Sequence, residues 1–369
     1  MDRRTFLKVG GAATAVAIAG GGSFVLWAHA GAGRWREAVE AIRRPLASGL
    51  TGRAAEGELV RYATLAANSH NSQPWRFAVD DGAITILPDL ARRLAVVDPD
   101  DHHLFASLGA AVENIVQAAP LLGLIAEPRF DPAGDGRVVV ALREGQPAAA
   151  PLAAAIPLRQ CTRALYDGRA VPDTDRQALA VAGRGDGVDV LMLTERPAID
   201  AVAAFVIDGN TRQIADPAFM AELKDWVRFS YSQALATGDG LFAKTTGNPV
   251  LPGPVGRALF DLVVTAASEN RRYAAQIVSS AGLAVFVSEK NDKEHWIAAG
   301  RAYQRFALQA TALGIKHAFL NQAVEVKEVR QRLAEHLGLG ERRADLIVRF
   351  GYGEAMPGSL RRPVAAVLT

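Results

Sequence analysis

The chain has 369 residues, half of them hydrophobic, and 41 basic against 39 acidic residues give it a net charge of +2. This balance excludes the basic excess that recruits nucleic acid or an anionic surface. Cys161 is the only cysteine, so no internal disulfide can form and the apolar core has to hold the fold together. The length allows one large domain or two smaller ones.

The N-terminal residues have the pattern of an export signal. Arg3 and Arg4 precede a Gly/Ala-rich apolar stretch, residues 9–27, which ends in the small-residue cleavage pattern Ala28-His29-Ala30. We predict a twin-arginine signal peptide over residues 1–30, transport in the folded state by the twin-arginine translocase, and a periplasmic or extracytoplasmic location. Two alternatives stay open: an uncleaved signal that tethers the protein to the membrane, and a buried helix after a chance Arg-Arg pair.

Two segments near the start of each half of the chain match. Ile42-Arg43 followed by Gly52-Arg53 corresponds to Leu158-Arg159 followed by Gly168-Arg169, with the same spacing from the arginine to the Gly-Arg turn. In both halves this turn precedes a helical pattern.

A second pair of segments matches later in each half. An apolar helix that contains Gly109 and ends at Leu122-Gly123-Leu124 corresponds to one that contains Gly300 and ends at Leu313-Gly314-Ile315. Coincidence between Ala/Leu-rich helices could explain this pair alone, but not two pairs in the same order. We therefore predict an α+β fold of two tandem repeats that form an intramolecular pseudo-dimer.

The elements expected in chain order define the two repeats. The first repeat spans residues 31–145 and the second spans residues 146–369, with a Pro/Ala-rich linker at 146–155. Strands are expected at 75–79 and 137–142 in the first repeat, and at 188–193 and 344–352 in the second. An insertion at about 196–270 has no counterpart in the first repeat. Within it we expect helices at 199–214 and 218–236, and then a long loop at 237–254 that is either a lid or a surface excursion.

The segment Asn68-Ser69-His70-Asn71-Ser72-Gln73-Pro74-Trp75 is rich in hydrogen-bonding side chains and lies between a helix end and a strand start. Amides and hydroxyls in fixed places suit a planar polar heterocycle. A helix C-cap followed by a polar turn explains the same residues equally well.

This segment resembles the Ala-Pro-Ser-x-x-Asn-x-Gln-Pro-Trp signature of the FMN-dependent nitroreductase family, with Ala-Asn-Ser in place of Ala-Pro-Ser. Arg159-Gln160-Cys161-Thr162-Arg163 resembles the family's Arg-Arg-Ser-x-Arg start. The segment 350–354 together with Arg361-Arg362-Pro363 resembles its glycine-rich closing strand and basic tail. The tandem arrangement and the twin-arginine signal are similar to the Acg-like branch.

The resemblance implies a nitroreductase-like fold in which one repeat supplies the amide-rich segment and the other supplies the arginines. It implies contacts to the flavin ring from the first repeat and to the flavin phosphate from the second. The cofactor-binding residues expected on this basis are Asn68, Ser69, His70, Asn71, Gln73, Arg159, Thr162, Arg163, Gly351, Arg361 and Arg362.

The symmetry-related site is degraded in the sequence. The repeat alignment places Ala47 at the position of Arg163, and residues 184–191 at the position of the amide-rich segment have neither the amides nor the Pro-Trp pair. We therefore predict one FMN per chain and a monomer that acts as a fused dimer.

No metal site and no catalytic side chain are expected. Asp98, Asp100, Asp101, His102 and His103 contain metal-ligating residue types, but adjacent histidines rarely converge and the acidic run fits a helix N-terminus.

The resemblance implies an oxidoreductase that reduces a small nitroaromatic or quinone-like acceptor through the flavin. Family members use NAD(P)H, which is not expected outside the cytoplasm, so the electron donor stays open. The alternative is a protein that binds and sequesters FMN without turnover.

Overall fold

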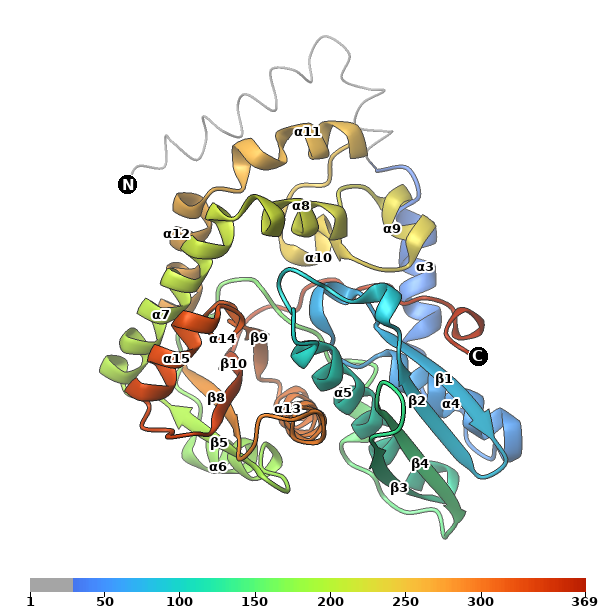
Figure 1. Cartoon of the computed structure of the whole chain (residues 1–369). Coiled ribbons are helices and arrows are strands. Elements are labelled where there is room, and N and C mark those ends of the chain that lie inside the picture. The colour runs from blue at the N-terminus through green and yellow to red at the C-terminus, as the bar shows by residue number, and fades with distance from the viewer. Residues whose placement is uncertain (1–28) are drawn as a thin grey trace.

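The computed structural model of the chain describes residues 29–369 (Figure 1). The export signal predicted for residues 1–30 therefore lies outside the described residues except for its last two positions. The predicted α+β class is confirmed, because the described chain contains two separate four-stranded sheets flanked by helices.

The first sheet is antiparallel with the order β1-β2-β4-β3. Its strands are β1 (Trp75–Asp80), β2 (Ala83–Pro88), β3 (Leu124–Asp131) and β4 (Arg137–Glu144). Alternate residues of β2 and β4 are buried, because one face of the sheet shares a hydrophobic core with α4 (Gly52–Thr64) and α5 (His102–Ala118).

The second sheet is antiparallel with the order β5-β8-β10-β9. Its strands are β5 (Val188–Leu193), β8 (Gly282–Ser288), β9 (Lys316–Phe319) and β10 (Arg343–Gly351). Every residue of β8 and β10 is buried, because helices cover both faces of this sheet. One face packs on α6 (Asp173–Ala182) and α13 (Lys293–Ala312). The helices on the other face are α7 (Arg196–Ala215), α12 (Ala266–Val278), α14 (Gln322–Glu325) and α15 (Lys327–His336).

The two sheets have the same connectivity. In each sheet the first strand in the chain pairs with the second, the second with the fourth, and the fourth with the third. The strands expected from the sequence are confirmed as β1, β4, β5 and β10. A strand follows α5 and α13 in equivalent places, β3 and β9 respectively.

Helices α5 and α13 cross between the two sheets (Figure 1). Across this crossing Gln304 Nε2 donates to Asn114 Oδ1 at 2.7 Å, and Arg305 Nη1 donates to the buried carboxylate of Glu113 at 2.9 Å. The stretch His102–Leu122 is the one helix among residues 29–369 that is long and apolar enough to cross a membrane. Because 78% of its most apolar window is buried inside the protein, the stretch fits a core helix.

The insertion consists mainly of helices that lie across one end of both halves (Figure 1). After α7 it contains α8 (Pro217–Trp226), β6 (Val227–Arg228), α9 (Tyr231–Thr237), β7 (Leu241–Phe242), α10 (Ala243–Thr246), α11 (Gly253–Val263) and α12. The insertion joins β5 to β8 in the second sheet. The equivalent strands of the first sheet, β1 and β2, are joined only by the two-residue turn Asp81-Gly82. The extra material therefore extends to residue 278, beyond the expected boundary at about 270.

Two expectations for the insertion are wrong in detail. The single helix expected at 218–236 is broken, because Val227 and Arg228 pair in parallel with Leu241 and Phe242 and Ser230 caps the new helix α9. The loop expected at 237–254 contains β7 and α10 and is therefore not one long irregular segment.

The linker and the C-terminal tail both join the first half. Ala153, Ala155 and Ile156 are buried in the first core, so the end of the segment predicted as a linker at 146–155 is packed against the first half. The tail crosses back from β10 to the first sheet, where Phe77 N donates to Val367 O at 2.8 Å. Near the other end of the described chain, α3 (Ala32–Ile42) packs Trp35 against Tyr231 and Phe242 of the insertion.

The remaining short elements are 3₁₀ turns. They are η1 (Ser69–Asn71), η2 (Leu90–Arg92), η3 (Ala119–Leu122), η4 (Ala153–Ala155) and η5 (Val364–Ala366).

Candidate functional site

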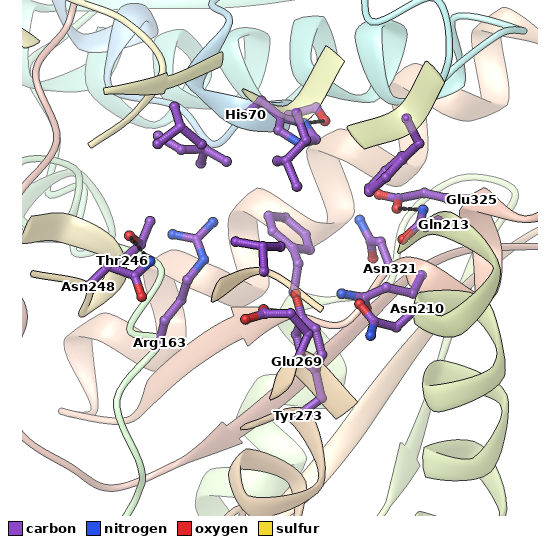
Figure 2. Close-up of a pocket in the computed structure, with 18 of the residues that line it drawn as sticks. His70, Arg163, Asn210, Gln213, Thr246, Asn248, Glu269, Tyr273, Asn321 and Glu325 are labelled. Atoms are coloured by element: carbon purple, nitrogen blue, oxygen red, sulfur yellow. Dashed lines mark hydrogen bonds between the residues drawn. The ribbon is translucent and has the colours of Figure 1, made fainter. Parts of the chain in front are cut away.

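A cavity of about 330 Å³ lies where the two halves and the insertion meet (Figure 2). Its apolar surface comes largely from the insertion, including Phe219, Phe229 and Phe260. Its polar groups come from both halves, with residues 68–70 and His103 on one side and Arg163 and Glu325 on the other. An apolar chamber of this size with a few convergent polar groups is typical of a small-molecule site.

The segment that joins α4 to β1 forms a strained turn at the cavity wall. His70, Asn71 and Gln73 have left-handed backbone angles, with φ of 50°, 54° and 54°. The Asn68 side chain stabilises the turn, because its Oδ1 accepts a hydrogen bond from Gln73 N at 2.8 Å. Non-glycine residues in this region cost about 1–3 kcal/mol each and concentrate at functional sites.

Four of the residues expected to bind a cofactor line the cavity: Asn68, Ser69, His70 and Arg163. Ser69 Oγ and His70 Nδ1 form a hydrogen bond of 3.2 Å. The backbone of Arg163 is held by Gln276, whose Nε2 donates to Arg163 O at 2.6 Å. Within residues 29–369 the Arg163 guanidinium has no carboxylate within 4.0 Å, and it points into the cavity (Figure 2).

Asn71 and Gln73 do not line the cavity. Asn71 Nδ2 donates to Gly240 O at 3.2 Å, and Gln73 Nε2 donates to Gly238 O at 2.9 Å. Gln73 Oε1 also accepts from Arg362 N in the C-terminal tail at 2.8 Å. The two amides therefore connect the first half to the insertion and the tail.

Arg159 and Arg361 both lie at the C-terminal end of α4. Arg159 Nη2 donates to Leu65 O at 2.9 Å, and Arg361 donates to Thr64 O at 2.6 Å and to Ala66 O at 3.1 Å. These are carbonyls that a helix end leaves without partners. No carboxylate within the described chain forms an ion pair with either arginine, although both are buried.

The other three expected residues also lie away from the cavity. Thr162 is buried, its hydroxyl has no hydrogen-bond partner among residues 29–369, and its backbone N donates to His317 O at 2.9 Å. Gly351 ends β10 against the ring of Tyr166, where a Cβ would lie 2.9 Å from Cδ2. The Arg362 side chain donates to Ala366 O at 2.6 Å. Cofactor binding by these residues remains a prediction.

His70 is neutral at physiological pH. Burial, reinforced by the positive charge of Arg163, lowers the pKa of His70 to about 4. The turn therefore presents a neutral imidazole to the cavity, and Arg163 supplies a positive charge from the other side.

The opposite wall carries amides and carboxyl groups that the sequence reasoning missed. Gln213 Nε2 donates to Glu325 Oε2 at 2.6 Å, and Asn210 and Asn321 lie beside them (Figure 2). Gln322 also lines the cavity, and its buried Oε1 has no partner within the described chain. Burial raises the pKa of Glu325 to about 7.

One signal in the sequence could have indicated part of this wall. Ile199, Val202 and Val206 form the buried stripe of α7 at helical spacing, and Asn210 and Gln213 continue the same stripe. Polar residues on a buried helix face require partners, so their presence indicates a polar interior surface.

His102 and His103 form a buried pair beside the cavity, with ring centroids 4.7 Å apart. Asp98 Oδ1 and Oδ2 accept hydrogen bonds from His103 N and Leu104 N, each at 2.9 Å, so the acidic run does cap α5 as expected. The expectation that the adjacent histidines diverge is wrong. Their rings converge because the second half binds both, through Asp345 at 2.8 Å from His102 Nε2 and Glu325 at 3.6 Å from His103 Nε2.

Burial dominates the electrostatics of this pair. It lowers the pKa of His103 to about 3 and that of His102 well below its usual range, so both imidazoles are neutral. Burial also raises the pKa of Asp98 and of Asp345, each to about 7.

The arrangement provides binding and positioning groups. Among the described residues the cavity offers one unpaired cation, two neutral imidazoles, several amides and an apolar surface, all suited to a flat, partly anionic ligand. The one serine–histidine side-chain hydrogen bond at the cavity in the described chain joins neighbouring residues, Ser69 Oγ and His70 Nδ1 at 3.2 Å.

The sequence is similar over most of its length to curated mycobacterial proteins. It is 27% identical over 316 residues to "Putative NAD(P)H nitroreductase Rv3131" of Mycobacterium tuberculosis H37Rv, covering 83% of this chain and 88% of that protein. The counterpart in strain CDC 1551, "Putative NAD(P)H nitroreductase MT3217", gives the same values. The nitroreductase resemblance is supported by these relatives. No protein-family model matches the sequence.

Solved nitroreductase structures match the chain weakly. The FMN-dependent nitroreductase NfnB from Mycobacterium smegmatis has a TM-score of 0.38 and 15% identity, covering 57% of this chain and 94% of that one. A nitroreductase with bound FMN from Desulfitobacterium hafniense has a TM-score of 0.36 and 13% identity, covering 60% and 98%.

Proposed function

We propose that this protein is an FMN-dependent, nitroreductase-like oxidoreductase that binds one flavin in the cavity between its two halves. Supporting this proposal are the curated relatives named NAD(P)H nitroreductases, the Asn68 to Trp75 signature, and the composition of the cavity. The observation that carries it is Arg163, a cation from the second half that points into the cavity without an acidic partner in the described chain, opposite the turn at Ser69 and His70 of the first half (Figure 2).

The fused-dimer organisation is part of the proposal. The identical strand order of the two sheets and the equivalent positions of α5 and α13 support an origin by duplication. The two halves already provide both sides of a dimer interface, so we propose a monomer in solution.

The residues at the cavity fit a flavin mononucleotide. Arg163 would pair with an anionic part of the cofactor, because a guanidinium keeps its charge and donates several hydrogen bonds. Asn68, Ser69 and the backbone of the turn would supply donors and acceptors to polar ring edges. The unpaired Oε1 of Gln322 accepts no hydrogen bond within the described chain and therefore suits a ligand N–H or O–H.

Bound FMN would supply reversible two-electron transfer. The chain's own residues bind and orient the reactants. The phenylalanines of the insertion exclude water, and Arg163 favours negative charge on a nearby ligand. No acid–base side chain is required by this scheme, in keeping with the expectation that the protein has no catalytic residue.

A second function, flavin sequestration without turnover, is favoured by one feature of the cavity. The insertion contributes Leu241, Ala243, Thr246, Pro249 and Leu251 from the segment 237–254, for which the sequence leaves a lid and a surface excursion open. A chamber lined by this segment could hold a flavin without admitting a second reactant.

We also propose that the protein is exported after folding, with its cofactor acquired in the cytoplasm. The support is the sequence pattern at Arg3 and Arg4. In that location the donor need not be a nicotinamide nucleotide, and the acceptor is proposed to be a small nitroaromatic or quinone-like compound.

Anaerobic reduction of the purified protein distinguishes these functions. The visible flavin absorbance is recorded, then NADPH or NADH is added, then dithionite. Bleaching by a nicotinamide nucleotide, followed by reoxidation with a nitroaromatic or quinone, supports the reductase. Bleaching by dithionite alone supports sequestration or another donor. A colourless protein that takes up no added FMN contradicts both.

A further inference from the structure

A buried cluster beside the cavity has no role in the proposed flavin site. Asp98, His102 and His103 each offer one ligand atom, and these atoms all lie within 4.8 Å of one another. All three residues are buried, with at most 5% of their surface exposed. His103 borders the cavity, so the cluster lies in its wall.

His102 has an unpaired nitrogen at this cluster. Its Nε2 is 2.8 Å from Asp345 Oδ1, whereas its Nδ1 is buried without a hydrogen-bond partner in the described chain. Ser288 N fixes Asp345 by donating to its other oxygen at 2.8 Å. In metal-binding histidines one ring nitrogen is typically hydrogen-bonded to a carboxylate, which orients the ring, and the other nitrogen binds the metal. His102 has this arrangement.

Helix capping explains only part of the cluster. Asp98 accepts the backbone N–H groups of His103 and Leu104, which accounts for its position. Each carboxylate oxygen keeps a second lone pair, however, and capping does not account for the free His102 Nδ1 or for the convergence of two imidazoles.

We propose that Asp98, His102 and His103 bind a divalent transition-metal cation of the Zn²⁺ type in the cavity wall. Two imidazoles and one carboxylate match the ligand preferences of such cations, whereas Mg²⁺ and Ca²⁺ prefer oxygen ligands throughout. Three protein ligands leave a coordination position open, and Glu325, 3.6 Å from His103 Nε2, is a further carboxylate next to it.

The charges around the cluster are compatible with a bound cation. The charges of Arg330 and Arg343 act on both imidazoles. Arg330 Nη1 donates to Val324 O at 2.6 Å, and Arg343 pairs with Asp100 at 2.8 Å and with Asn291 at 2.6 Å. Arg343 Nε is 3.9 Å from Asp345 Oδ1, the carboxylate oxygen that His102 Nε2 contacts. The carboxylates of Glu325 in α14 and Asp345 in β10 face the cluster from the second half.

Zinc binding by the full chain tests the proposal. The protein is freed of metal with a chelator, its fold is checked by circular dichroism, and Zn²⁺ is titrated calorimetrically. We expect one Zn²⁺ per chain and at least tenfold weaker binding for His103→Gln and for His102→Gln. The matched control is His295→Gln, because His295 forms a surface His–Asp pair with Asp292 at 2.7 Å. Its zinc affinity should be unchanged.

Two further measurements keep the test independent of misfolding. Asp345→Asn leaves the three ligands in place but removes the carboxylate behind His102, and we expect a 10- to 100-fold loss of zinc affinity. Co²⁺ in the unchanged chain should give visible absorption bands that disappear in His103→Gln. A folded, metal-free chain that binds no Zn²⁺ overturns the proposal. Binding that His102→Gln, His103→Gln and Asp345→Asn all leave intact, or that only His295→Gln removes, overturns it as well.

Discussion

Gly109 of α5 packs against the backbone of α13, and Gly300 of α13 packs against the backbone of α5. A Cβ on Gly109 would lie 2.0 Å from the carbonyl oxygen of Ile297, and a Cβ on Gly300 would lie 1.9 Å from that of Ala106. Ala106 and Ile297 each stand three residues before the glycine of their own helix. The contact of Gly109 with α13 and the contact of Gly300 with α5 are therefore equivalent, as symmetry-related contacts are at the axis of a two-fold dimer.

Substitution of either glycine should therefore destabilise the protein strongly. In Gly109→Ala or Gly300→Ala the new methyl group meets backbone, which cannot rotate away, so the two helices have to separate. We expect a loss of about 3 kcal/mol or more in the free energy of unfolding. Urea denaturation measures it.

Gly57 provides the matched control for this prediction. It lies inside α4, and a Cβ there would meet nothing within 4 Å. Gly57→Ala should raise the free energy of unfolding by about 0.5–1 kcal/mol, because alanine favours the helix. Equal effects at positions 57 and 109 would mean that the crossing is not close-packed.

Arg361 is expected to act as a structural residue. Its guanidinium bridges the end of α4, the tail and Asn71, whose Oδ1 accepts at 2.8 Å. Lysine lacks the planar fork, so Arg361→Lys should lower the free energy of unfolding by about 1.5–3 kcal/mol. The control is Arg143→Lys, at an exposed arginine paired with Glu127, which should change it by less than about 0.5 kcal/mol.

The affinity for FMN separates this structural role from cofactor binding. If folded Arg361→Lys protein binds FMN as tightly as the unchanged chain, the residue positions the tail only. A loss of affinity without a loss of stability would restore the role that the sequence resemblance implies.

Stability should fall with pH through the titration of His70. The pKa of His70 is about 4 in the folded chain and ordinarily 6.5, so between these values the unfolded state binds more protons. The free energy of unfolding therefore decreases as the pH falls from about 6.5 to about 4, and it is unaffected by this group above that range.

His70→Asn isolates this contribution, because asparagine tolerates the left-handed backbone at φ 50° and does not titrate. The decrease in the free energy of unfolding from pH 7 to pH 5, measured by urea denaturation, should be smaller in the variant by roughly 1–2 kcal/mol. Water in the cavity reduces the effect below its full value. Identical drops in both proteins would show that His70 is not held neutral by its surroundings.

Much of the sheet architecture could be predicted from the sequence, whereas most of the cavity could not. Strands such as 188–193 follow from local patterns of apolar residues, and the helices with Gly109 and Gly300 follow from repeated sequence. The break at 227–230 could not be predicted, because it depends on pairing with Leu241 and Phe242, more than ten residues away.

The candidate site shows the same limit. His70 and Arg163 could be selected from a contiguous motif, and both line the cavity. Glu325 lies in the four-residue helix α14, where nothing local distinguishes it from a surface acid. Its burial beside Gln213 arises only when residues 112 positions apart are brought together.

The central claim, one flavin held by Arg163 between the two halves, is tested most directly by fluorescence titration of FMN. We expect one FMN per chain, and an affinity about 10- to 150-fold lower for Arg163→Ala, the equivalent of 1.5–3 kcal/mol for a charged hydrogen bond. Arg143→Ala, which removes a surface arginine paired with Glu127, should leave the affinity unchanged. Two flavins per chain, no binding, or equal affinity in Arg163→Ala and the unchanged protein would contradict the account.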